Sequence, residues 1–429
     1  MPLQPGPSIV SFPLVETGTV AVDGSFAGPA RIRGDVLYLS TQEGLVYAVG
    51  MTSRRILWRF ASKDPQPEAP EIGKDYVYVR DAPGLLIALD THGRAALTLK
   101  LPARPATSVR EYRGRLYFGS GDGRLICLDP GAGGGPVWDF KASGPVVAGP
   151  EFSGERIFVA DARGKFYAVD LVGKRLWTFD PGSPVTAAPA SAGGRVYFGT
   201  AAGDFYALDE ATGKKKWIFR LGAAPSHPAC VSGDRLVLAA ANSVVYCFSA
   251  RGGEILWWRN VPARIVHAPV VANGTVLLTG LGPGLMGVDL ATGKPSGLFG
   301  LDEEPVAEPV WIPPRLAVLE SPAPDGRSRI ALLAPDVRLS AGAEPTVLSA
   351  PGKAVEIKAA SSGFDHPLYE FYVVEDGRLD RRQGPSARDS WTWRPPKAGA
   401  YTLSVRAFDR FQSREARLRL VVENGPGKH

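Results

Sequence analysis

The 429-residue sequence has few cysteines, no long hydrophobic run and no long run of one charge. No stretch approaches the roughly 18 consecutive apolar residues that a membrane-spanning helix needs, so no span is expected. The longest basic run is Lys214–Lys216 and the formal net charge is only +6, so binding to nucleic acid is not expected. Cys127, Cys230 and Cys247 cannot all pair within one chain, and their spacing matches no zinc-binding pattern.

Residues 1–8 also lack the basic and apolar regions of a signal peptide. Two interpretations of this N-terminus remain open. The protein is cytoplasmic, or the sequence is the mature form of an exported protein, with the signal peptide absent from this chain.

Glycine and proline are abundant, with 50 and 38 residues, while 45% of the residues are hydrophobic. A disordered chain would have far fewer apolar residues. Short apolar segments separated by many tight turns are typical of strands joined by turns. The composition therefore predicts an all-β protein, and the length indicates more than one domain.

An internal repeat of about 40 residues runs through most of the sequence. Its clearest copies, residues 154–177 and 194–217, contain a glycine turn, a β-rich run, a second turn, an apolar run that ends in Asp, and a Trp. The glycines that begin the copies are 39 to 41 residues apart, at Gly34, Gly73, Gly114, Gly154, Gly194, Gly233 and Gly274. About 40 residues accommodate four short strands, the content of one β-propeller blade.

The number of blades follows from extending the repeat. One more step reaches residues 315–333, where two apolar runs resemble the middle strands of an eighth copy. This copy lacks a clear fourth strand, and Ser8–Phe12 is expected to supply it, because a propeller usually closes its ring with a strand from the other terminus. Residues 1–338 are therefore expected to form an eight-bladed propeller. A seven-bladed ring with residues 305–335 as a linker is the alternative.

Two residue types recur at fixed positions of the repeat. Aspartates end the third strand and precede a glycine-bearing turn, where an Asp side chain caps its own backbone. Tryptophans follow that turn, where a large flat side chain packs one blade against the next. The aspartates are Asp90, Asp129, Asp170, Asp209 and Asp289, and the tryptophans are Trp58, Trp138, Trp177, Trp217 and Trp257. Both sets are interpreted as structural rather than catalytic.

Cysteines and histidines are the remaining candidates for chemistry. Cys127 and Cys247 share a repeat position with alanines of other copies, so they are expected to fill a small buried slot. His227 and His267 lie about one repeat apart, each before a first strand, where a metal pair near the channel is conceivable. No third ligand occurs at a matching position, so packing is the preferred interpretation. No catalytic, cofactor-binding or metal site is therefore expected.

The run from Tyr206 to Trp217 resembles the repeat of PQQ-like propellers, and seven copies cover residues 34 to about 300. In this family the quinoprotein dehydrogenases typically carry adjacent cysteines, calcium ligands and a catalytic aspartate around their cofactor. None of these transfers to the present sequence, so the resemblance implies no cofactor. Another branch includes the propeller lipoprotein of the outer-membrane β-barrel assembly machinery. The sequence is similar to that branch in its repeats, but it has no lipidation cysteine near residue 1 and continues into a C-terminal domain.

This second domain follows where the repeat stops, after Pro335. Residues 339–345 are expected to be a linker, residues 346–423 a β-sandwich and residues 424–429 a tail. Five strands are predicted from alternating apolar and polar residues, and residues 391–409 resemble the end of bacterial immunoglobulin-like modules. Weak candidates for binding in this domain are the basic residues Arg381, Arg382, Arg388 and Arg394 and the aromatic residues Trp391 and Trp393.

A non-catalytic scaffold of the bacterial cell envelope fits these features best. It would bind protein partners through the propeller loops or the immunoglobulin-like domain, in the periplasm or outside the cell, with the cytoplasm as the alternative location. Two other functions remain open. One is a quinone-dependent dehydrogenase that uses the central channel, and the other is a carbohydrate-binding protein that uses Trp391 and Trp393.

Overall fold

The computed structural model describes residues 14–64, 68–81, 84–225, 227–262, 264–280, 282–313, 315–335, 338–344, 346–348, 350–362, 364, 367–375, 378–408 and 413–423. The chain divides into a larger unit, residues Glu16–Ile312 and Leu316–Leu332, and a smaller unit that contains Leu333–His429. Within the described residues the one helical element is the 3-10 turn η1 (Pro130–Ala132), so the all-β prediction is confirmed. No helix in the described ranges is long and apolar enough to cross a membrane.

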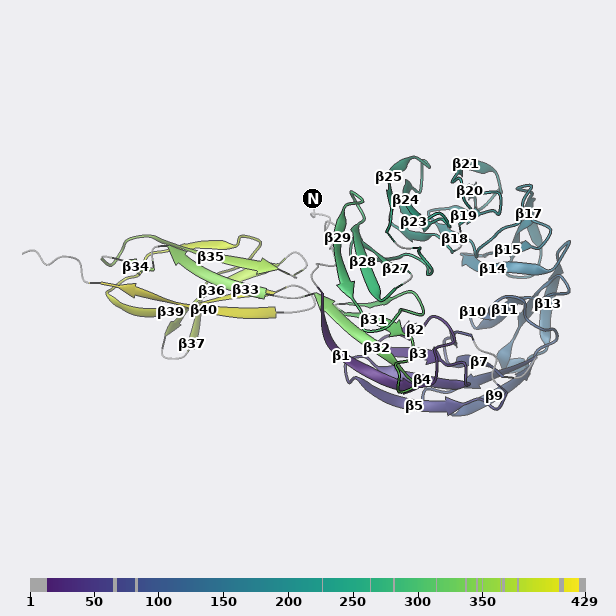
Figure 1. Cartoon of the computed structure of the whole chain (residues 1–429), viewed down its shortest axis with the longest axis horizontal. Coiled ribbons are helices and arrows are strands. Elements are labelled where there is room, and N and C mark those ends of the chain that lie inside the picture. The colour runs from purple at the N-terminus through teal and green to yellow at the C-terminus, as the bar shows by residue number, and fades with distance from the viewer. Residues whose placement is uncertain are drawn as a thin grey trace, which may run out of the picture. The chain divides into compact units, whose positions relative to one another are not determined.

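The described residues of the larger unit form eight four-stranded antiparallel sheets, numbered here in chain order (Figure 1). Sheets 1 to 4 contain β2 (Arg31–Arg33), β3 (Val36–Ser40), β4 (Leu45–Gly50) and β5 (Arg55–Ala61); β6 (Glu71–Ile72), β7 (Val77–Asp81), β8 (Leu85–Leu89) and β9 (Ala95–Lys100); β10 (Arg110–Tyr112), β11 (Arg115–Gly119), β12 (Arg124–Leu128) and β13 (Pro136–Lys141); and β14 (Val146–Ser153), β15 (Arg156–Asp161), β16 (Phe166–Asp170) and β17 (Arg175–Phe179). Sheets 5 to 8 contain β18 (Ala190–Ala192), β19 (Arg195–Gly199), β20 (Asp204–Asp209) and β21 (Lys215–Arg220); β22 (Cys230–Ser232), β23 (Arg235–Ala239), β24 (Val244–Ser249) and β25 (Ile255–Asn260); β26 (Val270–Ala272), β27 (Thr275–Thr279), β28 (Gly284–Asp289) and β29 (Pro295–Gly300); and β30 (Val310–Ile312), β31 (Arg315–Glu320), β32 (Arg327–Pro335) and β1 (Leu14–Asp23).

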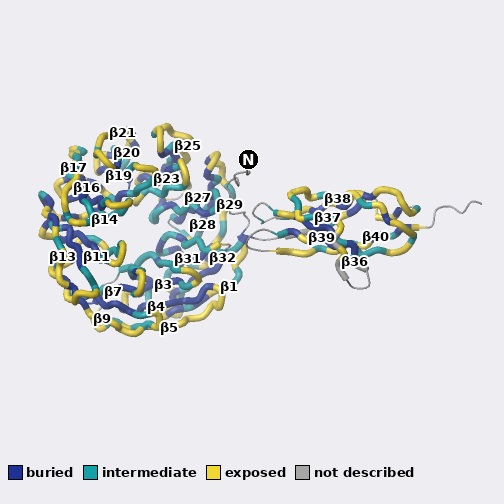
Figure 2. The backbone as a smooth tube through the Cα atoms, turned by 180° about the vertical axis from the view of Figure 1, so that it is seen from behind, coloured by how far each residue is buried: buried dark blue, intermediate teal, exposed yellow. Residues whose placement is uncertain are grey.

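In each sheet the two middle strands are the buried ones. In sheet 5, β19 and β20 are buried along most of their length, whereas alternate residues of the fourth strand, β21, are exposed. The reason is that a middle strand has a neighbour on both sides, while the fourth strand lies at the rim of the unit (Figure 2). Leucine, valine, tyrosine and phenylalanine dominate the middle strands because their side chains pack well on a covered surface.

The core lies between neighbouring sheets. Phe166 of sheet 4 stacks on Phe198 of sheet 5, with ring centroids 4.2 Å apart and planes at 15°. Both rings are almost completely buried, in a cluster to which only these two sheets contribute. Each sheet therefore needs its neighbours to cover its faces, which is why the repeats follow one another around a common centre (Figure 1).

Sheet 8 joins the two ends of the ring. Its fourth strand is β1, which pairs with β32, and Thr17 Oγ1 donates a hydrogen bond to the Leu332 carbonyl at 3.0 Å. The expectation that Ser8–Phe12 supplies this strand is wrong, since Leu14–Asp23 takes the place; Ser8–Phe12 lie outside the described residues. Residues 305–335 are not a linker either, because they contain three paired strands.

A buried carboxyl group lies in sheet 8. Glu320, at the end of β31, is 0% exposed, and among the described residues no hydrogen-bond partner meets either of its carboxyl oxygens. Its nearest cation is Arg329, whose Nε is 3.6 Å from Glu320 Oε2, and this guanidinium also pairs with Asp302 and with Glu16 of β1. Burial raises the pKa of Glu320 to about 7, with Arg329 opposing and Asp302 and Glu16 adding to the increase.

The smaller unit is a two-sheet β-sandwich. One sheet contains β33 (Arg338–Glu344), β35 (Val355–Ser362) and β38 (Ser390–Trp393), and the other contains β34 (Val347–Leu348), β40 (Ser413–Val422), β39 (Gly399–Phe408), β36 (Leu368–Glu375) and β37 (Arg378–Ser386). Ile357 of the first sheet and Phe371 and Val405 of the second belong to one core, and each is at most 1% exposed. The five strands predicted from sequence are present.

The prediction of a linker at residues 339–345 is wrong for residues 339–344. Strand β33 occupies residues 338–344 and pairs with β35 in continuous antiparallel register. Small residues, Ser340, Ala341, Gly342 and Ala343, made this segment read as a linker. Pairing with β35 satisfies its backbone, so a strand forms in spite of the low β-propensity of these residues.

Replacing Glu320 by Gln tests the buried carboxyl group. Its pKa is about 7 in the folded chain against an ordinary 4.5, so the folded state holds the proton more tightly than the unfolded state. This group therefore makes the free energy of unfolding fall as the pH rises from about 4.5 to about 7, by on the order of 3 kcal/mol. The free energy of unfolding of E320Q minus that of the wild type is therefore expected to be larger at pH 8 than at pH 5. Urea unfolding of both proteins at the two pH values measures this, and a difference that does not change with pH would contradict it.

Candidate functional site

Five tryptophans, in sheets 1 and 3 to 6, each connect their own sheet to the next, while sheet 2 has Leu97 at this position. Each lies in a fourth strand, and its indole Nε1 donates to a backbone carbonyl 33 residues later, at 2.8 to 3.4 Å. The donor and acceptor pairs are Trp58 and Thr91, Trp138 and Leu171, Trp177 and Glu210, Trp217 and Ala250, and Trp257 and Leu290. The six-membered ring lies over a glycine of the same turn, so closely that a Cβ atom on Gly213 would be 2.6 Å from Trp177. These indoles are used in packing between sheets.

The recurring aspartates cap turns of the repeat, and tryptophans lie on four of these five turns; the turn under Trp217 has Ser249 in place of the aspartate. Asp90 Oδ1 accepts from the backbone N–H groups of His92 and Arg94 at 2.8 and 2.9 Å. Asp129, Asp170, Asp209 and Asp289 make the same kind of bond to their own turns. Hydrogen bonds from Thr212 and Lys216 lower the pKa of Asp209 to about 2. The five carboxylates are therefore engaged with the backbone of their own turns.

The tryptophan series ends at sheet 7, where Gly297 occupies the position. The reason lies in sheet 8, whose third strand ends at Pro335 without turning into a fourth strand, since that strand comes from the N-terminus. The turn that an indole at position 297 would cover is absent from sheet 8. On the side of sheet 8 that faces sheet 1, the fourth strand β1 also has a glycine. This residue, Gly18, lies against Arg54 in the turn of sheet 1.

The two histidines lie close enough to interact. Burial lowers the pKa of His227 and of His267, and the charge of His227 lowers the pKa of His267 further, while Glu308 opposes both shifts. His267 Nδ1 is 3.0 Å from Thr279 Oγ1. Nowhere in the described ranges do three or more His, Cys, Asp or Glu side chains gather in a way that could hold a metal ion.

The three cysteines are unpaired thiols. Cys127 and Cys247 are completely buried at the same position of the third strand, and Cys230 is partly buried in a first strand. Burial raises the pKa of all three thiols, that of Cys247 to about 11. A protonated thiol is a poor nucleophile at neutral pH.

The candidate residues of the smaller unit do not form one binding platform. Trp391 and Trp393 stack with centroids 5.8 Å apart, and both are partly buried against the sandwich core. Arg382 pairs with Asp380 at 2.6 Å, and Arg394 Nη1 donates to the Gly352 carbonyl at 3.0 Å. The side chain of Arg381 lies outside the described part of the chain.

An apolar groove of about 260 Å³ lies where sheets 6 and 7 meet. It is bounded by the segment that joins the two sheets, by the turn between β27 and β28, and by β29. Its floor includes Ile265 and Leu278, which are at most 7% exposed, while Leu298 at its edge is 71% exposed. The lining residues are Val261, Pro262, Ile265, Leu278, Gly280, Gly282, Pro283, Gly284, Met286 and Leu298. Sequence reasoning missed this groove.

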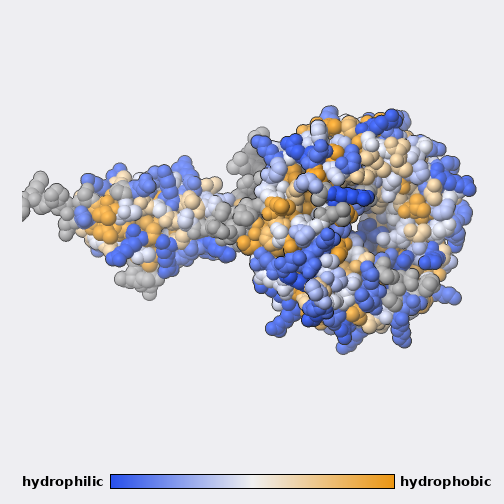
Figure 3. Space-filling view, in the orientation of Figure 1, coloured by the Kyte–Doolittle hydropathy of each residue, from blue (hydrophilic) through white to orange (hydrophobic). Residues whose placement is uncertain are grey.

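At one position of the fourth strand, the rim beside the groove is apolar where sheets 1 to 4 are polar. The residue equivalent to Leu298 is Trp258 in sheet 6 and Ile218 in sheet 5, and these are 53% and 43% exposed. In sheets 1 to 4 the same position holds Arg59, Thr98, Asp139 and Thr178. The surface of the larger unit accordingly combines hydrophilic and hydrophobic patches around a hollow near the middle of its face (Figure 3). The change from polar to apolar residues at this position of the repeat was visible in the sequence.

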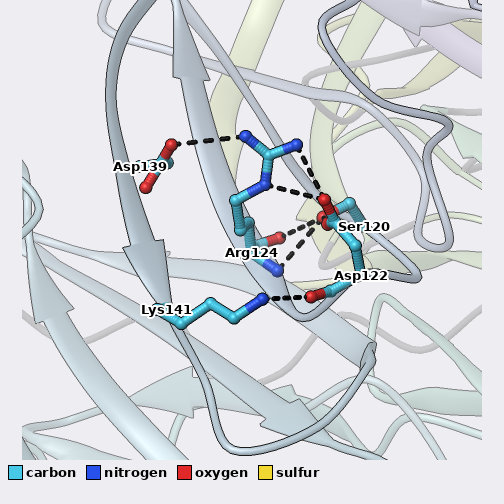
Figure 4. Close-up of polar contacts among 5 residues, drawn as sticks. All are labelled: Ser120, Asp122, Arg124, Asp139 and Lys141. Carbon is cyan, nitrogen blue, oxygen red and sulfur yellow. Dashed lines mark hydrogen bonds and ion pairs between the residues drawn. The ribbon is translucent and has the colours of Figure 1, made fainter.

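In sheet 3 the residue equivalent to Leu298 is Asp139, which pairs with Arg124 of the neighbouring strand. Arg124 Nε donates to Asp122 Oδ2 at 2.8 Å, and its Nη1 donates to Asp139 Oδ2 at 3.4 Å (Figure 4). Lys141 and Ser120 hold the same turn through the Asp122 carbonyl and carboxylate. The hydrogen bond from Arg124 is the main reason that the pKa of Asp122 is lowered. At this position the charges satisfy one another, while the neighbouring Val137 of β13 is 44% exposed.

One protein-family model, described as outer membrane protein assembly factor BamB, matches residues 16–133, 103–227 and 206–311. No curated protein matches the sequence. The matches overlap and together cover all but the last part of the larger unit, which confirms the resemblance to PQQ-like propellers.

Solved structures resemble the larger unit in fold. BamB from Moraxella catarrhalis has a TM-score of 0.62 and 16% identity, over 75% of this chain and 99% of that one. The computationally designed Ika8 protein has a TM-score of 0.61 and 15% identity, over 76% and 99%. Quinohemoprotein alcohol dehydrogenase from Comamonas testosteroni has a TM-score of 0.56 and 12% identity, over 75% and 76%. At these identities the similarity shows the fold alone.

Replacing Gly213 by Ala tests the contact between neighbouring sheets. The new Cβ atom would meet Trp177 at 2.6 Å, and φ at this glycine is +68°. We expect a loss of about 3 kcal/mol in the free energy of unfolding from clash and backbone strain together. Gly222 is a matched control, because its φ is +76° and nothing lies within 4 Å of the new atom. G222A should cost only about 1 kcal/mol. Equal losses in urea unfolding would show that the indole contact contributes little.

Proposed function

The chain belongs to the family described as outer membrane protein assembly factor BamB, and on that premise we propose that it is a non-catalytic scaffold that binds another protein in the bacterial cell envelope. The eight sheets are the blades of an eight-bladed propeller, and the C-terminal sandwich is an immunoglobulin-like domain. A periplasmic location is part of the proposal. The partner docks on the rim of blades 6 and 7, which are sheets 6 and 7 above.

The observation that carries the proposal is the exposed apolar surface around the groove. Trp258 and Leu298 are 53% and 71% exposed at a position where blades 1 to 4 present polar side chains. Exposed apolar residues that cluster beside a groove are typical of protein-binding surfaces, and Trp is among the residues most enriched at their centres. A protein that only had to remain folded would gain nothing from exposing them.

The environment of the other candidate residues favours binding over catalysis. The buried thiols have raised pKa values, and the recurring aspartates are bonded to their own turns. The likeness to an alcohol dehydrogenase at 12% identity carries no more than the fold. Trp391 and Trp393 are packed against the sandwich core, so they do not favour carbohydrate binding.

Affinity capture with matched variants tests the docking surface. The tagged full chain is incubated with a detergent extract of the cell envelope, and the captured proteins are quantified by mass spectrometry. We expect one partner to be enriched by the wild type and reduced at least tenfold by L298R, because a charge would be placed at the edge of an apolar groove. T98R is the control, since Thr98 is exposed at the same repeat position of blade 2. Equal loss with both variants, or no enriched protein, would reject the proposal.

Equilibration with PQQ and calcium tests the alternative of a quinone-dependent dehydrogenase. We expect no absorbance of bound cofactor after gel filtration and no oxidation of alcohols with an artificial electron acceptor. A stoichiometric cofactor band that survives gel filtration would favour the enzyme.

A further inference from the structure

A tyrosine closes the space between neighbouring blades at several points of the repeat. Tyr206 of β20 donates its hydroxyl hydrogen to the Pro181 carbonyl at 3.3 Å, and Tyr246 of β24 donates to the Leu221 carbonyl at 3.2 Å. In both cases the acceptor precedes the tyrosine by 25 residues and lies where the chain leaves the previous blade. The phenol therefore fills the space at the junction of two blades.

In blade 7 this tyrosine is replaced by Met286. The residue 25 positions before it is Val261, and both residues line the groove. Methionine has no ring and no hydroxyl group, so it neither fills the place of the phenol nor bonds to the carbonyl there. The groove is therefore located where the repeat elsewhere places a tyrosine side chain.

The partner of this tyrosine on the preceding blade changes as well. Phe140 meets Tyr167, and Phe179 meets Tyr206, edge to face at 5.4 and 5.5 Å. Phe219 meets Tyr246 at 6.2 Å. In the next blade Arg259 takes the place of the phenylalanine in the strand, and its Nε donates to the Gly293 carbonyl of blade 7 at 2.8 Å. A guanidinium group packs well against an aromatic ring, so the position still suits an aromatic neighbour.

Two arginines lie in the segment that supplies most of the lining of the groove. Residues 255–288, which form most of its walls, contain Arg259 and Arg264 and no Asp or Glu. Both arginines are exposed. A partner with carboxylates beside its aromatic residue would complement this surface.

We propose that the groove receives a tyrosine or phenylalanine side chain of a partner protein, flanked by carboxylates. The ring occupies the place of the missing phenol between Val261 and Met286, a tyrosine hydroxyl donates to the carbonyl of Val261, and the carboxylates face Arg259 and Arg264. The thioether of Met286 makes a favourable contact with an aromatic ring. The inference rests on the proposed function, since it specifies the chemistry of the partner at the same site.

Methionine-methyl NMR of the full chain tests the proposal with short peptides. The sequence contains three methionines, and Met51 is buried in blade 1, so it serves as an internal reference. Acetyl-Glu-Tyr-Glu-amide is expected to shift the Met286 methyl upfield by ring current, with a Kd of roughly 1 mM for so small a ligand. The Met51 methyl should not move. Acetyl-Glu-Leu-Glu-amide and acetyl-Lys-Tyr-Lys-amide should bind at least fivefold more weakly. Equal binding by the leucine peptide, or no shift at Met286, would overturn the aromatic assignment.

Two substitutions at Met286 test whether the peptide binds in the groove or elsewhere on the surface. M286Y restores the residue that the repeat uses elsewhere, so the fold should be kept and the unchanged Met51 signal reports this. Fluorescence anisotropy of a labelled Glu-Tyr-Glu peptide should show at least tenfold weaker binding to M286Y than to the wild type. The affinity for M286L, which leaves the groove open, should stay within about threefold of the wild-type affinity. Unchanged binding to M286Y would overturn the proposal. If L298R loses the captured partner and the tyrosine peptide does not bind, then the scaffold function stands and only the aromatic chemistry fails.

Discussion

The larger unit depends on the contact between an indole of one sheet and the turn of the next. A four-stranded sheet cannot cover its own faces, so its stability comes from its neighbours. The five tryptophans place this contact at the same point of sheets 1 and 3 to 6, with a glycine beneath the indole and, in four of the five turns, an aspartate that holds the turn. Because donor and acceptor are 33 residues apart, each contact forms between adjacent repeats and fixes how one sheet lies on the next.

The same contact cannot form where the chain enters and leaves the ring. Sheet 8 takes its fourth strand from the N-terminus, so it has no turn for an indole to cover, and Gly297 and Gly18 stand on its two sides. Several departures from the repeat lie in this part of the molecule. They include the buried Glu320 beside Arg329 and the groove with Met286 in place of a tyrosine. A regular ring offers equivalent surfaces, so a partner can recognise one place only where the repeat is broken.

Much of this architecture was predictable because it is local. The spacing of glycines, the aspartates that cap turns and the tryptophans that follow them repeat within about 40 residues and appear in the sequence as a pattern. The closing strand was assigned to Ser8–Phe12 instead of Leu14–Asp23, because a strand at the rim exposes half its residues and carries a weak apolar pattern. Strand β33 was read as a linker for a similar reason, since its pairing with β35 decides its conformation.

The sequence by itself determined the repeat, the all-β class, the two-part organisation and the structural role of the recurring Asp and Trp residues. Only the tertiary structure decided where a partner would find a place to bind. Val261 and Met286 are 25 residues apart, and neither is unusual alone; they form a groove because two sheets pack with a methionine where a phenol is otherwise placed. A cavity is a property of packing between distant residues, whereas a repeat is a property of neighbours along the chain.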